Sequence, residues 1–185
     1  MILFPKHAPQ PGPAPGRIER IANNRADYLL EGPGGLSPIA TAFAILFLPK
    51  PLPEPIELSW QLGRGTQTIT KARALLRHVP PAVDEDGWFR IHPEILDKRY
   101  SPAVQLTWIL LRRYIVDGKT GLWMRKYQYG ARSLYRTIER DWTQPMSRRS
   151  WSEGMRTLQK DLWITPFGME QVGLVIPSLP AYLLK

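Results

Sequence analysis

The chain has no cysteine among its 185 residues, which excludes disulfide bonds, cysteine-ligated zinc sites and thiol nucleophiles. It also lacks a long apolar run: the longest, residues 39–48, has ten residues, about half of what a membrane-spanning helix needs. The N-terminal stretch has only Lys6 before a proline-rich segment, so it has neither the basic region nor the apolar core of a signal peptide. We therefore expect a cytoplasmic protein that does not bind a membrane.

Acidic residues are few relative to basic ones. The chain has 16 Asp and Glu against 25 Lys and Arg, a net charge of +9. Residues 101–165 hold twelve of these cations and five acids, a net of +7, which leaves +2 for the rest of the chain. A basic charge concentrated in one half favours a polyanionic partner, and nucleic acid is the first candidate.

Patterns of catalysis or metal binding are also missing. Gly63 and Gly65 lack the Gly-Lys-Ser/Thr ending of a phosphate-binding loop, so they predict a turn. No Ser/His/Asp arrangement has a supporting context, and the sequence predicts neither an enzyme nor a cofactor or metal. The remaining candidates are isolated histidines and carboxylates in turn-like sequence: His7, His78, His92, Asp84, Glu85, Asp86, Glu94 and Asp97.

Proline is abundant but uneven, and it divides the chain. Eleven of the nineteen prolines lie in residues 1–56, which predicts a partly irregular, proline-rich arm that serves oligomerisation or partner docking. The apolar run 39–48 cannot stay exposed and is expected to order against a partner. Residues 57–86 are interpreted as a connecting region, and residues 87–185 as one domain.

Local patterns in the first half are weak. Residues 17–30 predict one short helix. The segment QLGRGTQTIT (61–70) indicates a glycine turn followed by a short strand, and KARALLRHV (71–79) indicates a short helix.

From residue 88 onward the pattern is sharper. WFRI (88–91) predicts a strand, and Ser101 with Pro102 predicts the start of a helix. LWMRKYQY (122–129) is a strand candidate, and residues 131–142 predict a second amphipathic helix. A third helix is predicted from the Ser147 cap, followed by a glycine-containing loop at 165–171 and a strand at 172–177. The apolar stripe of this third helix comprises Trp151, Met155, Leu158 and Leu162.

The stretch SRRSWSEGMRTLQKDLWI (147–164) has a serine cap, arginines, a small residue and a bulky Leu-Trp-Ile ending. It resembles the recognition-helix stretch of winged helix-turn-helix proteins. GWFRIHPEIL followed by SPAVQLTWILLRRY resembles the entry into that domain in plasmid replication initiators and in phage replication or regulatory proteins. The resemblance covers roughly residues 87–177, and it implies a mainly α fold with a small β-wing, a winged helix-turn-helix in the C-terminal half. The connection GKTGLWMRKYQYG is longer and more aromatic than the family pattern.

The resemblance implies where DNA binds. In a helix-turn-helix the third helix enters the major groove, here residues 147–162, and arginine pairs with guanine in bidentate fashion. A solvated basic face without a ligand is the simpler alternative. The residues predicted to face bases or the groove are Ser147, Arg148, Arg149, Ser150, Ser152 and Arg156. Those predicted to contact phosphates are Lys126, Arg132, Ser133, Tyr135 and Arg136.

The sequence therefore predicts a sequence-specific, non-catalytic protein that binds double-stranded DNA, in replication initiation or transcriptional regulation of a plasmid, phage or mobile element. A homodimer or a protein partner would use the N-terminal half. The alternative is a structural or adaptor subunit of a larger nucleoprotein complex that binds RNA or a DNA backbone.

Overall fold

The computed structural model describes residues 19–116, 139, 142, 146–161, 163, 165–167 and 173–175. This part of the chain is mainly helical, as the sequence predicts. In chain order its elements are β1 (Glu19–Ala22), α1 (Asn23–Leu30), α2 (Leu36–Leu46), α3 (Pro55–Leu62), α4 (Thr66–Arg77), η1 (Asp84–Asp86), β2 (Trp88–Ile91), η2 (Pro93–Leu96), α5 (Pro102–Leu110), the π-helical η3 (Leu111–Val116), α7 (Arg148–Lys160), β3 (Thr165–Phe167) and β4 (Gly173–Val175).

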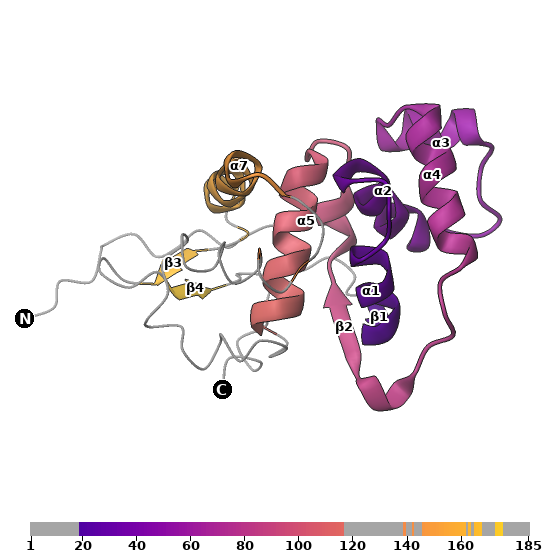
Figure 1. The fold of residues 1–185 in the computed structure, drawn as a ribbon. Helices are drawn as coiled ribbons and strands as arrows, with labels where there is room; N and C mark the ends of the chain where they lie inside the picture. Colours follow the sequence, from indigo (N-terminus) through magenta and orange to yellow (C-terminus); the bar gives the residue numbers. More distant parts are fainter. Residues whose placement is uncertain are drawn as a thin grey trace, which may run out of the picture.

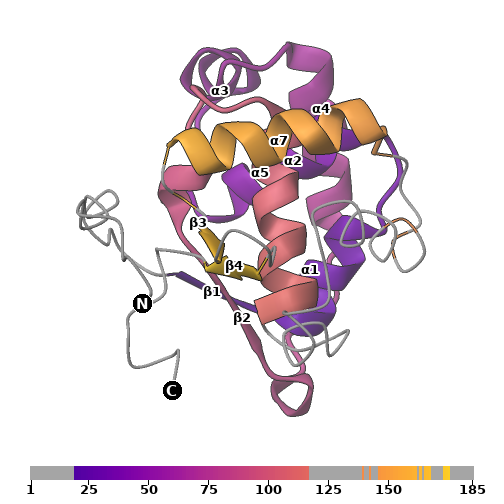
Figure 2. The same cartoon turned by 90° about the vertical axis from the view of Figure 1, so that its left-hand side faces the viewer.

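Helix α5 lies at the centre of the arrangement. Figure 1 shows α2, α3 and α4 on one side of α5 and α7 with β3 and β4 on the other. In the view of Figure 2, α7 crosses in front of α5. Both α2 and α7 pack directly on α5, and α4 packs on α2. The core is therefore continuous from the first described helices to the last.

The start of α5 was predicted correctly from its cap. The Ser101 hydroxyl accepts a hydrogen bond from the backbone N–H of Val104 at 3.4 Å, and Pro102 occupies the first turn, where its missing N–H costs nothing. Seven of the nine α5 residues are buried, including the whole indole of Trp108. A helix that is apolar on every side has to be covered on every side.

Residues 17–30 do not form one helix. Glu19–Ala22 is strand β1, which pairs antiparallel with β2, so that Ile21 lies opposite Phe89 and Ala22 opposite Trp88. The helix begins only at Asn23, whose N–H donates to the Gly87 carbonyl at 3.0 Å. The prediction was wrong for the first four described residues because the pairing strand lies about 70 residues away along the chain.

Residues 66–70 are also helical, where the sequence indicated a short strand. They open α4, whose buried residues Ile69, Ala72 and Leu75 recur every three positions and face α2. The β-branched residues of this segment favour a strand locally, but packing of the apolar stripe on α2 overrides that preference.

The expectation that the apolar run 39–48 orders against a partner is wrong. Its first seven residues belong to α2 and are buried in the chain's own core. The core also crosses the predicted divisions at 56/57 and 86/87, because β1 from the predicted arm pairs with β2 from the predicted C-terminal domain.

Two polar contacts join the N-terminal helix α1 to distant segments. The Arg113 guanidinium donates two hydrogen bonds to the Asp27 carboxylate, from Nε to Oδ1 at 2.9 Å and from Nη2 to Oδ2 at 2.8 Å. The indole Nε1 of Trp142 donates to the Leu30 carbonyl at 2.6 Å. The side chains of Arg113 and Trp142 are buried. If either acceptor were removed, a polar donor would stay unpaired in the core.

An aromatic cluster fixes the chain after α7. Trp163 meets Trp108 edge to face with ring centroids 5.9 Å apart, and His92 meets Trp108 at the same separation. The Trp163 Nε1 donates to the Tyr100 hydroxyl at 2.8 Å. Burial raises the pKa of the Tyr100 phenol above its ordinary value.

No helix within the described ranges is long and apolar enough to cross a bilayer.

Helix α7 approaches α5 closely at Gly154. A Cβ built at this position would lie 2.8 Å from Cβ of Thr107 and closer still to its hydroxyl. Thr107 is itself held by a 2.7 Å hydrogen bond from its hydroxyl to the Ala103 carbonyl. Only glycine permits this separation of the two helices.

We predict that Gly154→Ala lowers the free energy of unfolding by about 1–3 kcal/mol, because the added methyl group overpacks a filled contact. Thermal and urea denaturation measure the loss. Ser152→Ala, on the exposed side of the same helix, is the control and should leave stability unchanged. Adding Thr107→Ala to Gly154→Ala should recover part of the loss, and a strictly additive double variant would contradict the proposed clash.

Candidate nucleic-acid interface

Helix α7 begins at a serine cap, as the sequence predicts. The Ser147 hydroxyl accepts a hydrogen bond from the Ser150 N–H at 3.1 Å. The two hydroxyl groups also lie within hydrogen-bonding distance, at 2.9 Å. Ser147 and Ser150, both predicted to bind DNA, therefore hydrogen-bond to each other at the helix start in this structure.

One side of α7 is buried. Trp151, Met155 and Leu158 form the stripe that their spacing predicts, and Gly154 lies between them against α5. Leu162, the last predicted member, falls outside the described residues. The opposite side of the helix is thereby fixed as the exposed one.

The exposed side of α7 carries a row of charges. Arg149, Glu153, Arg156 and Lys160 recur every three or four residues and are exposed, with Ser152 beside them. Because a helix turns about 100° per residue, these side chains share one face. Within the described part of the chain, Arg149 and Arg156 make no ion pair.

Arg148 is exposed in the first turn, where the predicted face begins. The structure thus brings Arg148, Arg149, Ser152 and Arg156 to the exposed side of one helix. The five predicted phosphate-contacting residues, Lys126, Arg132, Ser133, Tyr135 and Arg136, fall outside the described residues.

Two charged members of the row were not predicted. Lys160 lies four residues after Arg156, and Glu153 lies four residues after Arg149. The same helical spacing that gave the buried stripe would have found both. Glu153 matters most, since a carboxylate accepts a hydrogen bond from cytosine N4 but repels a phosphate.

A short β-hairpin follows α7. Strands β3 and β4 pair antiparallel, with Thr165 opposite Val175 and Phe167 opposite Gly173. In Figure 1 they lie on the same side of α5 as α7. The sequence predicts the strand at 172–177, where β4 lies, but it predicts a loop at 165–171, where Thr165–Phe167 forms β3 through pairing with β4.

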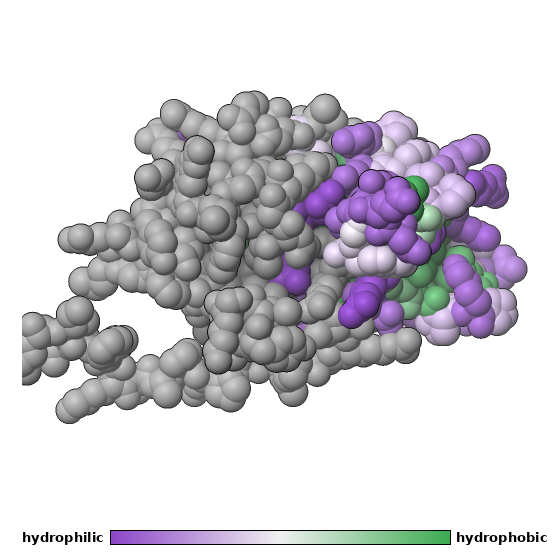
Figure 3. Space-filling view, turned by 90° about the horizontal axis from the view of Figure 1, so that it is seen from below, coloured by the Kyte–Doolittle hydropathy of each residue, from purple (hydrophilic) through white to green (hydrophobic). Residues whose placement is uncertain are grey.

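The candidate catalytic residues do not converge within the described residues. Asp84, Glu85 and Asp86 form η1, an exposed turn between α4 and β2. Figure 3 views the molecule from the side of this turn and shows hydrophilic residues gathered there. His92 is buried in the aromatic cluster, and His78 is exposed just after α4. No group of three or more metal-ligating side chains occurs among the residues that the structure describes.

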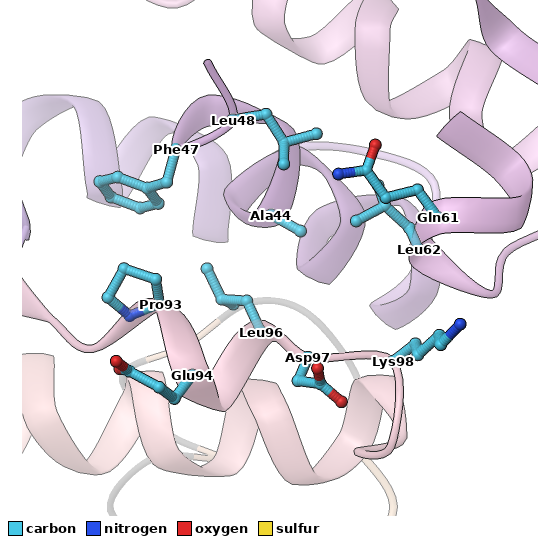
Figure 4. Close-up of a pocket in the computed structure, with 10 residues that line it drawn as sticks. All are labelled: Ala44, Phe47, Leu48, Gln61, Leu62, Pro93, Glu94, Leu96, Asp97 and Lys98. Atoms are coloured by element: carbon cyan, nitrogen blue, oxygen red, sulfur yellow. The ribbon is translucent and has the colours of Figure 1, made fainter. Parts of the chain in front are cut away.

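Glu94 and Asp97 line a hollow of about 360 Å³ between α2, α3 and η2. Figure 4 shows the α2 and α3 side chains on one wall and the η2 side chains on the other. The Asp97 carboxylate accepts a hydrogen bond from the Arg99 N–H at 2.9 Å, so it is engaged in its own turn. The lining is Ala44, Phe47, Leu48, Gln61, Leu62, Pro93, Glu94, Leu96, Asp97 and Lys98.

Comparison with known proteins gives no relative: no family model, curated protein or solved structure matches this chain.

We predict that Ser147→Ala destabilises the protein by about 0.5–2 kcal/mol, because the N–H of Ser150 loses its acceptor. Thermal denaturation followed by circular dichroism measures the change. Ser147→Asn is the matched control: it keeps a capping acceptor without adding charge, so it should retain most of the stability. Equal loss in both variants would show that the serine acts through something other than the cap.

Proposed function

We propose that the protein binds double-stranded DNA, without catalysis, through the exposed face of α7. The observation that carries the proposal is the division of this one helix. Its apolar side packs on α5 through the buried Trp151, Met155 and Leu158. Its other side presents Arg149, Arg156 and Lys160, which are exposed and make no ion pair among the described residues.

The charge of this helix supports a polyanionic ligand. Residues 148–160 contain four cations and one acid, a net of +3. An α-helix fits the major groove of B-DNA, and a helix presented in this way places its N-terminal residues nearest the bases. The capped start of α7 carries Arg148 and Arg149, so the arginines lie where base contacts are made in such complexes.

The hairpin after α7 supports the winged helix-turn-helix form of this proposal. In this proposal the β3–β4 hairpin, which follows α7 in the chain, contacts the backbone or the neighbouring minor groove. Phosphate contacts there would set the register of the complex, and the α7 side chains would set its sequence preference. A role in replication initiation or transcriptional regulation follows if one duplex sequence is preferred.

The first experiment selects duplexes from random DNA and then measures affinity for the selected duplex by fluorescence anisotropy. We predict that Arg149→Ala and Arg156→Ala each weaken binding to it by about 1–3 kcal/mol, which is about 5- to 150-fold. Both side chains are exposed, so the folded state should be unaffected.

The matched control is Arg149→Lys, which keeps the charge but cannot form the bidentate pair with guanine. If Arg149 reads a base, the lysine variant stays weak on the selected duplex and matches the native protein on a scrambled one. If it contacts phosphate, the lysine variant recovers on both. Unchanged affinity of both alanine variants for every duplex would remove α7 as the binding helix.

A second function is favoured by a different surface. Ile56 and Trp60, one turn apart on α3, are 66% and 79% exposed, and large apolar side chains at such exposure mark protein contacts. We therefore keep the adaptor subunit of a nucleoprotein complex as the alternative. Trp60→Ala in a pull-down would separate it from DNA binding, because that change leaves α7 intact.

A further inference from the structure

We propose that α4 is a second DNA-contacting helix, carried by a helix-turn-helix in the N-terminal half. Helices α3 and α4 are joined by three residues, Gly63, Arg64 and Gly65. A turn of three or four residues that contains glycine is characteristic of this motif. In Figure 1 the two helices lie together on the side of the molecule away from α7.

The turn has a defined geometry. Gly63 takes the left-handed conformation, with φ 61° and ψ 38°, which other residues adopt at a cost. The Arg64 N–H donates to the Ser59 carbonyl at 3.0 Å, and the Ser59 hydroxyl donates to the Arg64 carbonyl. These reciprocal bonds close the end of α3 onto the turn.

Arg64 holds the turn against the core rather than facing solvent. Its Nη2 donates to the Tyr100 carbonyl at 3.2 Å and to Oε1 of Gln105 in α5 at 3.1 Å. Desolvation lowers the pKa of this guanidinium, which nevertheless remains charged. The start of α4 is therefore fixed relative to α5.

Helix α4 is divided in the same way as α7. Ile69, Ala72 and Leu75 are buried against α2, with Arg73 half-buried at the edge of the stripe. The opposite side is exposed and wholly free of acid, because α4 contains no Asp or Glu. Its exposed residues are Thr66, Gln67, Thr70, Lys71, Ala74 and Arg77.

The side chains on this face include the types that contact bases and phosphates in duplex DNA. Gln67 lies at the second residue of the helix, and glutamine pairs in bidentate fashion with adenine. Lys71 and Arg77 supply charge for phosphates, and the methyl group of Ala74 between them does not block close approach. In the described part of the chain neither cation has an ion-pair partner, so the charge is available to a ligand.

The cationic, hydroxyl- and amide-bearing character of this face selects duplex DNA over a protein partner. A protein contact would favour the apolar pair Ile56 and Trp60 on α3 instead. Because α4 and α7 lie on opposite sides of α5 in Figure 1, the two helices would contact different stretches of duplex. The inference uses the α3–α4 unit alone and does not rest on the proposed role of α7.

The test compares four full-length proteins on one long duplex by fluorescence anisotropy from about 50 to 200 mM salt. They are the native chain, the α4 variant Lys71→Ala/Arg77→Ala, the α7 variant Arg149→Ala/Arg156→Ala and the combination of all four changes. We expect the α4 variant to bind about tenfold or more weakly, with a log–log salt slope smaller by about two. Alanine favours helix, and a thermal melt checks that each variant is folded.

Two further variants test charge and sequence preference separately. Lys71→Arg/Arg77→Lys keeps both charges and should bind like the native chain. Gln67→Ala should retain the salt slope and relax the sequence preference in a selection from random duplexes. Loss of binding in the charge-retaining variant would show that the α4 substitutions act by disturbing the fold, which would overturn the inference.

The outcomes for the two helices are distinguishable. If only the α7 variant weakens binding, α4 is not a DNA-contacting helix and the proposed function stands. If only the α4 variant does so, the inference stands and the role of α7 fails. If the α4 variant binds DNA normally but loses a protein partner or self-association, the face belongs to a protein contact and the inference is overturned.

Discussion

The burial of α5 is the constraint on which the other elements depend. A helix that presents Val104, Leu106, Trp108 and Ile109 around its circumference is stable only when other elements cover every side. Helix α2 covers one side and α7 covers another. The C-terminal half is therefore not a separable unit: residues 87–185 alone would expose the surface that α2 covers and would leave β2 without β1.

Both candidate DNA-contacting helices take their positions from this one helix. Helix α7 rests on α5 at the contact between Gly154 and Thr107. Helix α4 is placed less directly, through its packing on α2 and through the bonds from Arg64 to Gln105 and the Tyr100 carbonyl. Pre-organised binding helices lose little conformational entropy on binding. The ion pair between Arg113 and Asp27 further ties η3, which continues α5, to α1.

The sequence predicted the features that local physics determines. Ser101 and Ser147 were identified as caps because a hydroxyl before an apolar periodic segment satisfies free N–H groups. The buried stripe of α7 followed from spacing. Strand β1 was missed because its partner is distant, and α4 was misread because Thr66, Thr68, Ile69 and Thr70 favour a strand until α2 is present to bury Ile69. The DNA-contacting face proposed for α4 depends on this segment being a helix, so it could not be predicted for the same reason.

Charge counted along the sequence differs from the charge that the folded chain exposes. The net of +7 in residues 101–165 includes Arg112 and Arg113, which are buried, and Arg113 is committed to Asp27. Arg64 is likewise held by α5. In contrast, the twelve residues of α4 carry Lys71, Arg73 and Arg77 and no acid, within a region where the window count left almost no net charge. What a polyanion contacts is the charge on an exposed helical face. On that measure α4 presents two cations, Lys71 and Arg77, and no acid, while α7 presents four cations and Glu153.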